Sequence, residues 1–459
     1  MKLILALFAV VLVAVIAVLA ALSANPVVTV EPPVKAIGAA TPVRAEITAA
    51  YGIRRFTALV EQNGKQYTVF EKRTPSRRLL FMRHREDPQS ISFLAGKLRA
   101  PALHDGKATL IVEAQSNDFV GRTVSASFDV DVVLEPPRLA VDEAQHYINQ
   151  GGAELVTFTV SGDWNEAGVK VGPYTFTSYP LPGRPKNERF SLFVFPWDLP
   201  VDTVPHVYAR GAAGNEVTGR FWFKIFPKPF RARDLEITDA FLDKVVNQID
   251  PGGSGDLLTR FLRINGDLRK KDNQQLSDLR LKTEPRLLWS GPFAQLANSQ
   301  VEAHFADVRS YIYKGKKVDQ QVHLGFDLAS TQHVPVLAAN DGRVVWASDL
   351  GIYGNCIVLD HGYGLQSIYG HMSQIDVKVG DMVKKGQAMG HSGSTGLAGG
   401  DHVHFSMQID GVQTNPVEWF DEHWIHDRIL SKLASGAGSQ PAAASQAATT
   451  ASNGAIRNP

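Results

Sequence analysis

Five residues in the last third of the chain have side chains that can bind a metal or carry protons for it. They belong to three short motifs, His323-Leu-Gly-Phe-Asp327, Tyr369-Gly-His371 and His402-Val-His404. A catalytic zinc site uses three nitrogen or oxygen ligands from the protein and leaves a fourth position open for water. Histidines that are not ligands can transfer protons near neutral pH. The motifs together therefore predict the centre of a zinc hydrolase.

The elements that must position these side chains are predicted to be β-strands. In a strand, residues two or four positions apart point to the same face. His402 and His404 would therefore share a face, and His323 and Asp327 would do the same. Gly325 inside the first motif argues against a helix at that place. The expected scaffold of the site is a sheet.

Further segments around the motifs have a characteristic order. They are HLGFDLAS (His323–Ser330), PVLAANDGRVVWA (Pro335–Ala347), YGNCIVLDHGYGLQSIYGHMS (Tyr353–Ser373), VKVGDMVKKGQAMGHSGSTG (Val377–Gly396) and HVHF (His402–Phe405). In this order and spacing the region from about Phe293 to Phe420 resembles the lysostaphin-like zinc endopeptidases, which cut peptide cross-bridges in bacterial cell walls. Before the HxH pair this chain has Gly399-Gly400-Asp401, where many relatives carry proline.

The resemblance implies a role for each of the five residues. His323, Asp327 and His404 match the ligands of a single Zn²⁺. His402 matches the general base that acts on the bound water, and His371 matches the residue that stabilises the tetrahedral intermediate. Some relatives lack one or more of these residues and activate other wall enzymes without being catalytic, so a non-catalytic regulator is the alternative function. Because this chain retains all five, the resemblance favours an endopeptidase.

The substrate implied by the resemblance is peptidoglycan peptides, cut either at D-alanyl bonds to a diamino acid or at glycine-rich bridges. The sequence has no recognisable wall-binding domain, which favours the D-alanyl bonds. A regulatory protein partner is also consistent with the family. Nucleic acid is not an expected partner, because the net charge is only +1 over 459 residues.

The N-terminus is predicted to be an uncleaved membrane anchor over residues 1–24. Leu3–Leu22 contains no charged or strongly polar residue and is long enough to cross a bilayer as a helix. A cleaved signal peptide is the alternative, but the nearest candidate cleavage site, Leu22-Ser23-Ala24, does not begin with a small residue. Lys2 and the amino terminus carry the only positive charges before Lys35, so the rest of the chain should face away from the cytoplasm. The predicted location is the bacterial inner membrane, single-pass, with the catalytic domain in the periplasm.

The fold class is predicted to be mainly β. Short alternating strands with regular turns predict two immunoglobulin-like β-sandwiches, over residues 27–135 and 137–228. The segments Ala108–Pro137 and Val204–Pro229 repeat one pattern of strand, turn and strand. A helical connector over 232–288 should join them to an antiparallel-β zinc peptidase domain over 293–425. The tail over 435–459 lacks apolar bulk and is predicted to be disordered.

The connector should pack on the catalytic domain or above its cleft. Thr238 is the expected N-cap of its first helix, and Pro251-Gly-Gly is the expected end. Asn298, just before the core of the resemblance, is a candidate ligand that blocks the metal, with an ordinary loop asparagine as the alternative. His304 is expected at the entrance of the cleft. His333, His361 and His391 are interpreted as structural residues, and the single cysteine, Cys356, as a buried thiol.

Overall fold

The structure, a computed structural model, describes residues 2–77 and 85–435. Strands make up most of its regular secondary structure, which confirms the predicted mainly-β fold class. From residue 436 onward, the predicted disordered tail lies outside the described residues.

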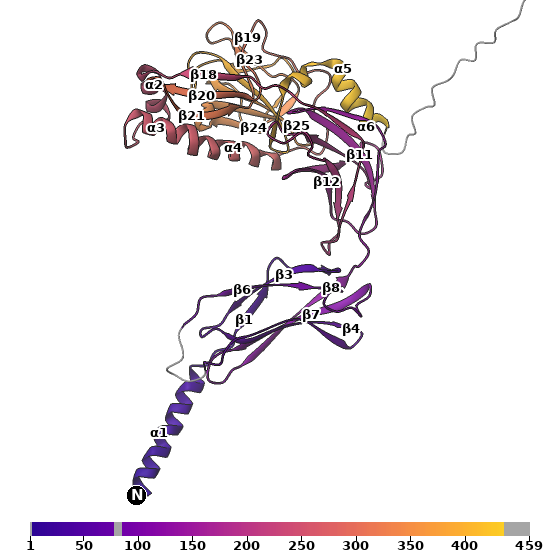
Figure 1. The fold of residues 1–459 in the computed structure, drawn as a ribbon, viewed down its shortest axis with the longest axis vertical. Coiled ribbons are helices and arrows are strands. Elements are labelled where there is room, and N and C mark those ends of the chain that lie inside the picture. Colours follow the sequence, from indigo (N-terminus) through magenta and orange to yellow (C-terminus); the bar gives the residue numbers. More distant parts are fainter. Residues whose placement is uncertain (1, 78–84, 436–459) are drawn as a thin grey trace, which may run out of the picture.

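Helix α1 (Lys2–Ala21) projects from one end of the molecule (Figure 1). At its C-terminal end, the Ser23 hydroxyl donates to the Leu19 carbonyl at 3.0 Å, and the Ala24 amide donates to Asp118 at 3.2 Å. Within the part of the chain that the structure describes, no helix is both long and apolar enough to cross a membrane. The anchor over residues 1–24 therefore stays a prediction.

The first β-unit follows α1 and has a hydrophobic core of its own. Its strands are β1 (Val27–Val30), β2 (Ala36–Ile37), β3 (Thr41–Thr48), β4 (Ile53–Gln62), β5 (Lys65–Arg73), β6 (Gln89–Ala95), β7 (Gly106–Ser116) and β8 (Thr123–Val132). One sheet has the order β1-β3-β6 and the other β2-β8-β7-β4-β5. Residues of β3 alternate between buried and exposed, as expected for a sheet with one face on a core.

The second β-unit is built differently, although the sequence predicted two equivalent modules. Its strands are β9 (Arg138–Val141), β10 (His146–Asn149), β11 (Ala153–Ser161), β12 (Glu166–Val171), β13 (Tyr174–Pro180), β14 (Glu188–Val194), β15 (His206–Arg210), β16 (Glu216–Gly219) and β17 (Phe223–Phe226). A seven-stranded sheet, β16-β15-β12-β13-β14-β11-β9, is accompanied by the parallel pair β10 and β17. The immunoglobulin-like class of both units stays a prediction.

The second β-unit shares one continuous core with the C-terminal domain, so it is not a self-contained module. Nearly every residue of β11 and β14 is buried, which shows that both faces of the sheet are covered there. Phe158 and Phe193 of this sheet belong to the same cluster of buried side chains as Phe326 and Trp419 of the C-terminal domain. Alternating strand patterns predicted the strands but carried no information on which surface would cover them.

A buried carboxyl group joins the two parts of this shared core. Glu418 lies in the 3-10 helix η5 (Pro416–Phe420) and is 6% exposed. Its Oε1 accepts a hydrogen bond from Asn149 Nδ2 at 2.7 Å, and its Oε2 accepts one from the Ala153 amide at 2.8 Å. Burial raises the pKa of Glu418 to about 7, although these hydrogen bonds act to lower it.

The substitution Glu418→Gln is expected to change how stability depends on pH. The folded protein holds the Glu418 proton more tightly than the unfolded chain, whose glutamates have a pKa near 4.5. This carboxyl therefore destabilises the fold progressively as the pH rises from about 4.5 to about 7. The stability advantage of the wild type over Glu418→Gln should shrink across that window, by up to about 3 kcal/mol. Urea denaturation at a series of pH values measures the free energy of unfolding of both proteins and so gives this difference.

Glu422→Gln is the matched control, because Glu422 is exposed at the start of the short helix α5 (Glu422–Ile425). This control should leave the pH profile of the wild type unchanged. A stability difference between wild type and Glu418→Gln that stays constant from pH 4.5 to pH 7 would contradict the assignment.

The connector contains three helices, as predicted. It also contains one strand, which the sequence did not predict. Its elements are β18 (Ala232–Glu236), α2 (Asp239–Ile249), α3 (Leu257–Arg263), the π-helical turn η2 (Ile264–Leu268), α4 (Arg269–Asp278) and the 3-10 turn η3 (Leu279–Leu281). Thr238 caps α2 as expected, its hydroxyl accepting from the Phe241 amide at 3.1 Å. Strand β18 pairs in parallel with β20 of the C-terminal domain. The buried faces of the helices share a core with that domain, so the connector is part of its structure.

The C-terminal domain is a group of sheets that carries the predicted site. Its strands are β19 (Gln300–Ala303), β20 (Asp307–Tyr313), β21 (Lys316–His323), β22 (Phe326–Ala329), β23 (Pro335–Leu337), β24 (Gly342–Asp349), β25 (Asn355–Gly362), β26 (Leu365–Met372), β27 (Gln374–Ile375), β28 (Met382–Val383), β29 (Ala388–His391), β30 (Val403–Ile409) and β31 (Val412–Thr414), with the 3-10 turn η4 (Gly351–Tyr353). The largest sheet has the order β19-β22-β30-β26-β25-β24-β28, with β31 paired to β30. Smaller sheets are β23-β29-β27 and β18-β20-β21.

The chain then returns to the second β-unit. After helix α5, the π-helical turn η6 (His426–Leu430) and helix α6 (Ser431–Ser435) lie beside β11 (Figure 1). Lys432 of α6 donates to the fully buried Glu154 of β11 at 2.7 Å. This contact fixes the end of the described chain to the shared core.

Candidate metal centre

The three predicted ligands lie on neighbouring strands of the C-terminal domain. His323 ends β21, Asp327 lies in β22 and His404 lies in β30. Strands β22 and β30 are antiparallel, with Asp327 opposite His404. On the other side of β30, Gly370 of β26 is opposite His404, which places His371 beside the site. The sheet register therefore brings together residues that are 77 positions apart in the chain, Asp327 and His404.

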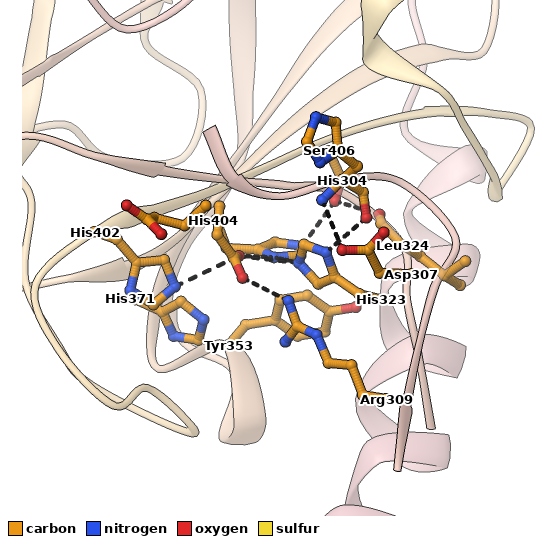
Figure 2. Close-up of polar contacts among 12 residues, drawn as sticks. His304, Asp307, Arg309, His323, Leu324, Tyr353, His371, His402, His404 and Ser406 are labelled. Carbon is orange, nitrogen blue, oxygen red and sulfur yellow. Dashed lines mark hydrogen bonds and ion pairs between the residues drawn. The ribbon is translucent and has the colours of Figure 1, made fainter. Parts of the chain in front are cut away.

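The side chains of these ligands converge on one point (Figure 2). His323 Nε2 lies 2.9 Å from both His404 Nδ1 and Asp327 Oδ1. Asp327 Oδ1 is 3.2 Å from His404 Nδ1. All three residues are largely buried, with exposures of 6%, 9% and 5% for His323, Asp327 and His404. Two imidazole nitrogens and one carboxylate oxygen thus face one another away from bulk water.

Hydrogen bonds to the other ring nitrogens determine which nitrogen of each histidine is free for a metal. The Nδ1 of His323 is 3.1 Å from the His304 carbonyl, which can only accept, so Nδ1 carries the proton and Nε2 has a lone pair. The Ser406 hydroxyl donates to the Leu324 carbonyl at 2.7 Å and therefore accepts from His404 Nε2 at 2.8 Å. His404 Nδ1 consequently has the lone pair. Both lone pairs lie on the atoms that converge.

Gly325 allows this close approach of strands. A Cβ atom at Gly325 would lie 2.4 Å from Ser406 Oγ and 2.7 Å from His404 Cε1. Any side chain there would displace the ligand or the hydroxyl that orients it. The glycine of the first motif is therefore required by packing against His404.

Asp327 is held by groups on both of its oxygens. Its Oδ1 faces the two ligand histidines, while Oδ2 accepts from Arg309 Nη2 at 2.6 Å. Burial alone would raise the pKa of Asp327, but the charge of His323 and the hydrogen bonds of the surrounding histidines hold it well below its ordinary value. Asp327 is therefore ionised near neutral pH, as a metal ligand must be. Arg309 was not identified from the sequence.

The two predicted non-ligand histidines lie beside the ligands. The rings of His371 and His402 have their centres 4.7 Å apart, and His402 Nε2 is 3.4 Å from Asp327 Oδ1. The Nδ1 of His371 contacts the Thr395 carbonyl at 2.8 Å, and that of His402 contacts the Gly400 carbonyl at 2.9 Å. Each Nδ1 therefore carries a proton, which leaves both Nε2 atoms to exchange protons with a molecule in the site.

The environment separates the proton affinities of these two histidines. Burial lowers the pKa of His371 well below its ordinary value. Burial acts in the same direction on His402, but its hydrogen bond to Asp327 outweighs it and raises the pKa. His371 also adopts a φ of 63°, in the left-handed region that non-glycine residues rarely occupy. Such backbone strain is concentrated at functional sites.

The five residues line a cavity of about 330 Å³ whose opposite wall comes from the connector. Connector residues in the lining include Ile237, Phe241, Arg269 and Asn273. The connector therefore lies at the cleft, as expected.

The expectation that Asn298 blocks the metal is wrong. Its side chain is exposed and does not line the cavity. Its backbone is in a left-handed turn with a φ of 54°, and its carbonyl accepts from the Ser330 hydroxyl at 3.2 Å. Asn298 is therefore an ordinary loop residue.

His361 and Cys356 are structural residues, as predicted, whereas His304 is not at the cavity as expected. His361 is fully buried between the Asp341 carbonyl and the Ser367 hydroxyl, each at 2.7 Å. Cys356 is buried, and burial raises the pKa of its thiol. His304 does not line the cavity; it acts through its carbonyl, which orients His323.

The donor set fits a zinc ion. Two neutral imidazoles and one ionised carboxylate are a ligand set used by catalytic zinc sites. The ligand atoms lie within 4.8 Å of one another. Each ligand also has a partner on its other atom, namely the His304 carbonyl, the Ser406 hydroxyl and the Arg309 guanidinium. Such partners fix the orientation of metal ligands.

Comparison with known proteins identifies the class of this domain. Residues 321–416 match the family model described as Peptidase family M23. The C-terminal part of the chain is thus a Peptidase M23 domain, which confirms the lysostaphin-like resemblance expected from the sequence.

Two curated relatives each match about a fifth of this chain. Over 97 residues the chain is 36% identical to the DD-carboxypeptidase/endopeptidase Mpg of Neisseria meningitidis serogroup B, covering 21% of this chain and 22% of that protein. Over 96 residues it is 36% identical to the peptidoglycan DD-endopeptidase ShyA of Vibrio cholerae, covering 21% and 22%. The crystallised catalytic domain of lysostaphin from Staphylococcus simulans has 25% identity and a TM-score of 0.21, covering 31% of this chain and 96% of that domain. The chain thus spans about a fifth of the length of its curated relatives.

Proposed function

We propose that this protein is a zinc-dependent endopeptidase that hydrolyses peptide cross-links of bacterial peptidoglycan, at D-alanyl bonds to a diamino acid. The observation that carries the proposal is the convergence of His323, Asp327 and His404, with His371 and His402 beside them. The names of the relatives Mpg and ShyA, both DD-endopeptidases, support this choice of bond over a glycine bridge.

The residues of the site have different roles in amide hydrolysis. A bound zinc ion would supply Lewis-acid chemistry, polarising the peptide carbonyl and making water acidic enough to ionise near neutral pH. His402 Nε2 accepts the proton of the attacking water, with Asp327 stabilising the imidazolium that results. His371 Nε2 faces the same cavity and, once this ring has taken up a proton there, donates toward the oxygen on which negative charge develops. The buried setting strengthens both interactions.

The proposed location is the bacterial inner membrane, single-pass, with the catalytic domain in the periplasm. The support is the uncharged segment Leu3–Leu22 and the single preceding charge on Lys2. N-terminal sequencing of protein purified from membranes tests this part of the proposal. A mature chain beginning near Asn25 would show a cleaved signal peptide instead.

Mass spectrometry of cross-linked muropeptides incubated with the zinc-loaded protein tests the activity. We expect each dimer to gain one water and to separate into two monomers. The His402→Ala variant, prepared in parallel, identifies any contaminating hydrolase. Intact dimers after incubation with fully zinc-loaded protein would overturn the proposal. In that case the regulator alternative is tested by adding the protein to a second purified wall hydrolase and measuring that enzyme's rate.

A further inference from the structure

Arg309 lies in the wall of the metal cavity with most of its hydrogen-bonding capacity unused. It belongs to β20, its side chain is 20% exposed, and it lines the cavity. A guanidinium group has five N–H donors. Across residues 2–77 and 85–435, the acceptor that contacts this group is Asp327 Oδ2, at 2.6 Å from Nη2. Largely buried donors are normally paired, so the remaining donors are available to a ligand.

Arg269 of α4 lines the same cavity, but its hydrogen bonds are to the connector. Its Nε donates to the Asn265 carbonyl at 3.1 Å and lies 3.2 Å from Asn265 Oδ1, with Nη2 on that same oxygen at 2.5 Å. Asn265 itself donates to Asp319 at 2.7 Å. Of the two arginines, Arg309 is the one that contacts a metal-site residue, Asp327.

The position of Arg309 places an anion beside the reacting bond. Asp327 Oδ1 faces the ligand histidines, and Arg309 holds the other oxygen of the same carboxylate. The guanidinium is therefore separated from the metal-binding point by one carboxylate group. Figure 2 shows the Arg309 side chain extending toward the histidines beside Tyr353.

We propose that Arg309 binds a carboxylate on the carbon that follows the scissile amide nitrogen, and so selects substrates that have one. This inference rests on the proposed function. Where the diamino acid has a carboxyl group on the carbon that bears the cross-linked amine, that carboxylate carbon is three covalent bonds from the scissile carbonyl carbon, a short reach. An internal amide of a glycine bridge has no carboxylate there. The planar guanidinium can contact Asp327 with one edge and the substrate carboxylate with another, which a lysine cannot do.

The cavity would otherwise oppose such a substrate. The carboxyl groups of Asp327 and Glu236 both line it. An anion brought next to these groups without a partner pays a desolvation and repulsion cost. Arg309 supplies the partner at the place where the substrate carboxylate binds. Removing the guanidinium should therefore abolish the preference for substrates with a free carboxylate over substrates without one.

Two matched substrates and two variants test the proposal. The substrates are a cross-linked muropeptide dimer with that carboxylate free and the same dimer with it amidated. The variants are Arg309→Lys and the control Arg233→Lys. Arg233 is exposed and directly opposite Arg309 in the β18–β20 pair. All proteins are compared at equal zinc content, measured for each preparation, and kcat/KM is determined for both substrates.

The wild type and Arg233→Lys should prefer the free carboxylate by ten- to a hundredfold, about 1.4 to 2.7 kcal/mol. Arg309→Lys should lose most of this preference, because its kcat/KM for the free-carboxylate dimer should fall much further than its kcat/KM for the amidated dimer, mainly through a higher KM. A wild type that cuts both dimers equally well overturns the proposal without any variant. An equal loss by Arg309→Lys on both dimers also overturns it, because Arg309 would then act only through Asp327. Failure of the proposed function is distinct, since neither dimer would be cut.

Discussion

Replacing His404 with alanine is expected to abolish zinc retention and, with it, peptide hydrolysis. His404 supplies one of three converging ligand atoms, and the remaining pair, His323 and Asp327, leaves too few protein ligands for a catalytic zinc site. Metal analysis of the dialysed protein should give one zinc per wild-type chain and almost none per His404→Ala chain.

Two further variants serve as comparisons for zinc binding: Ser406→Ala should have an intermediate effect and His333→Ala should have none. Ser406 only orients His404 through Nε2, so its loss should weaken zinc binding about ten- to a hundredfold, the usual scale for such partners. His333 is an exposed histidine whose Nδ1 contacts Ser373, and its variant should keep a full equivalent of zinc. A full equivalent of zinc in His404→Ala would falsify the ligand assignment.

The ligand set was accessible from the sequence through the family resemblance. The prediction that His323 and Asp327 lie on one face of a single strand is wrong, because β21 ends at His323 and β22 begins at Phe326 in another sheet. The alternation of strand side chains places His402 and His404 on one face wherever the strand lies. The structure confirms that β30 and β22 are strands and that their ligands face each other. The helix after Thr238 was accessible for a similar reason, since caps and apolar spacing are local features.

Arg309 was missed because its role depends on a hairpin register. Strands β20 and β21 pair with Asp307 opposite His323 and Arg309 opposite Gln321, and this register brings Arg309 to Asp327, 18 residues later in the chain. An arginine at an alternate position of a strand is normally interpreted as solvent-exposed. One feature of the sequence pointed to Arg309: it lies in the strand just before the strand that ends at His323. Tyr311 lies two residues later in the same strand and lines the same cavity.

The second β-unit shows the same limit at larger scale. Its strands could be predicted, but the coverage of β11 by the C-terminal helices brings together Glu154 and Lys432, 278 residues apart. Patterns within a strand do not encode such partners. The error on Asn298 has a related cause, because the direction of a loop side chain follows from a backbone turn with a φ of 54°.

His371→Ala and His402→Ala are expected to keep zinc and lose turnover, each by about a hundredfold or more. Neither ring supplies a converging ligand atom, so metal analysis should resemble that of the wild type. In both histidines a backbone carbonyl fixes the proton on Nδ1, so Nε2 is the atom that must exchange protons. Alanine removes that atom but leaves the three metal ligands in place.

The two variants should differ in their pH profiles. Asp327 raises the pKa of His402, whereas burial lowers that of His371. A base must be unprotonated to act, so the loss of activity of the wild type at low pH should follow His402 and be absent from the residual activity of His402→Ala. The same acid limb should persist in His371→Ala, because His402 is still present. Wild-type turnover in both variants at equal zinc content would reduce these histidines to structural residues and favour the regulator alternative.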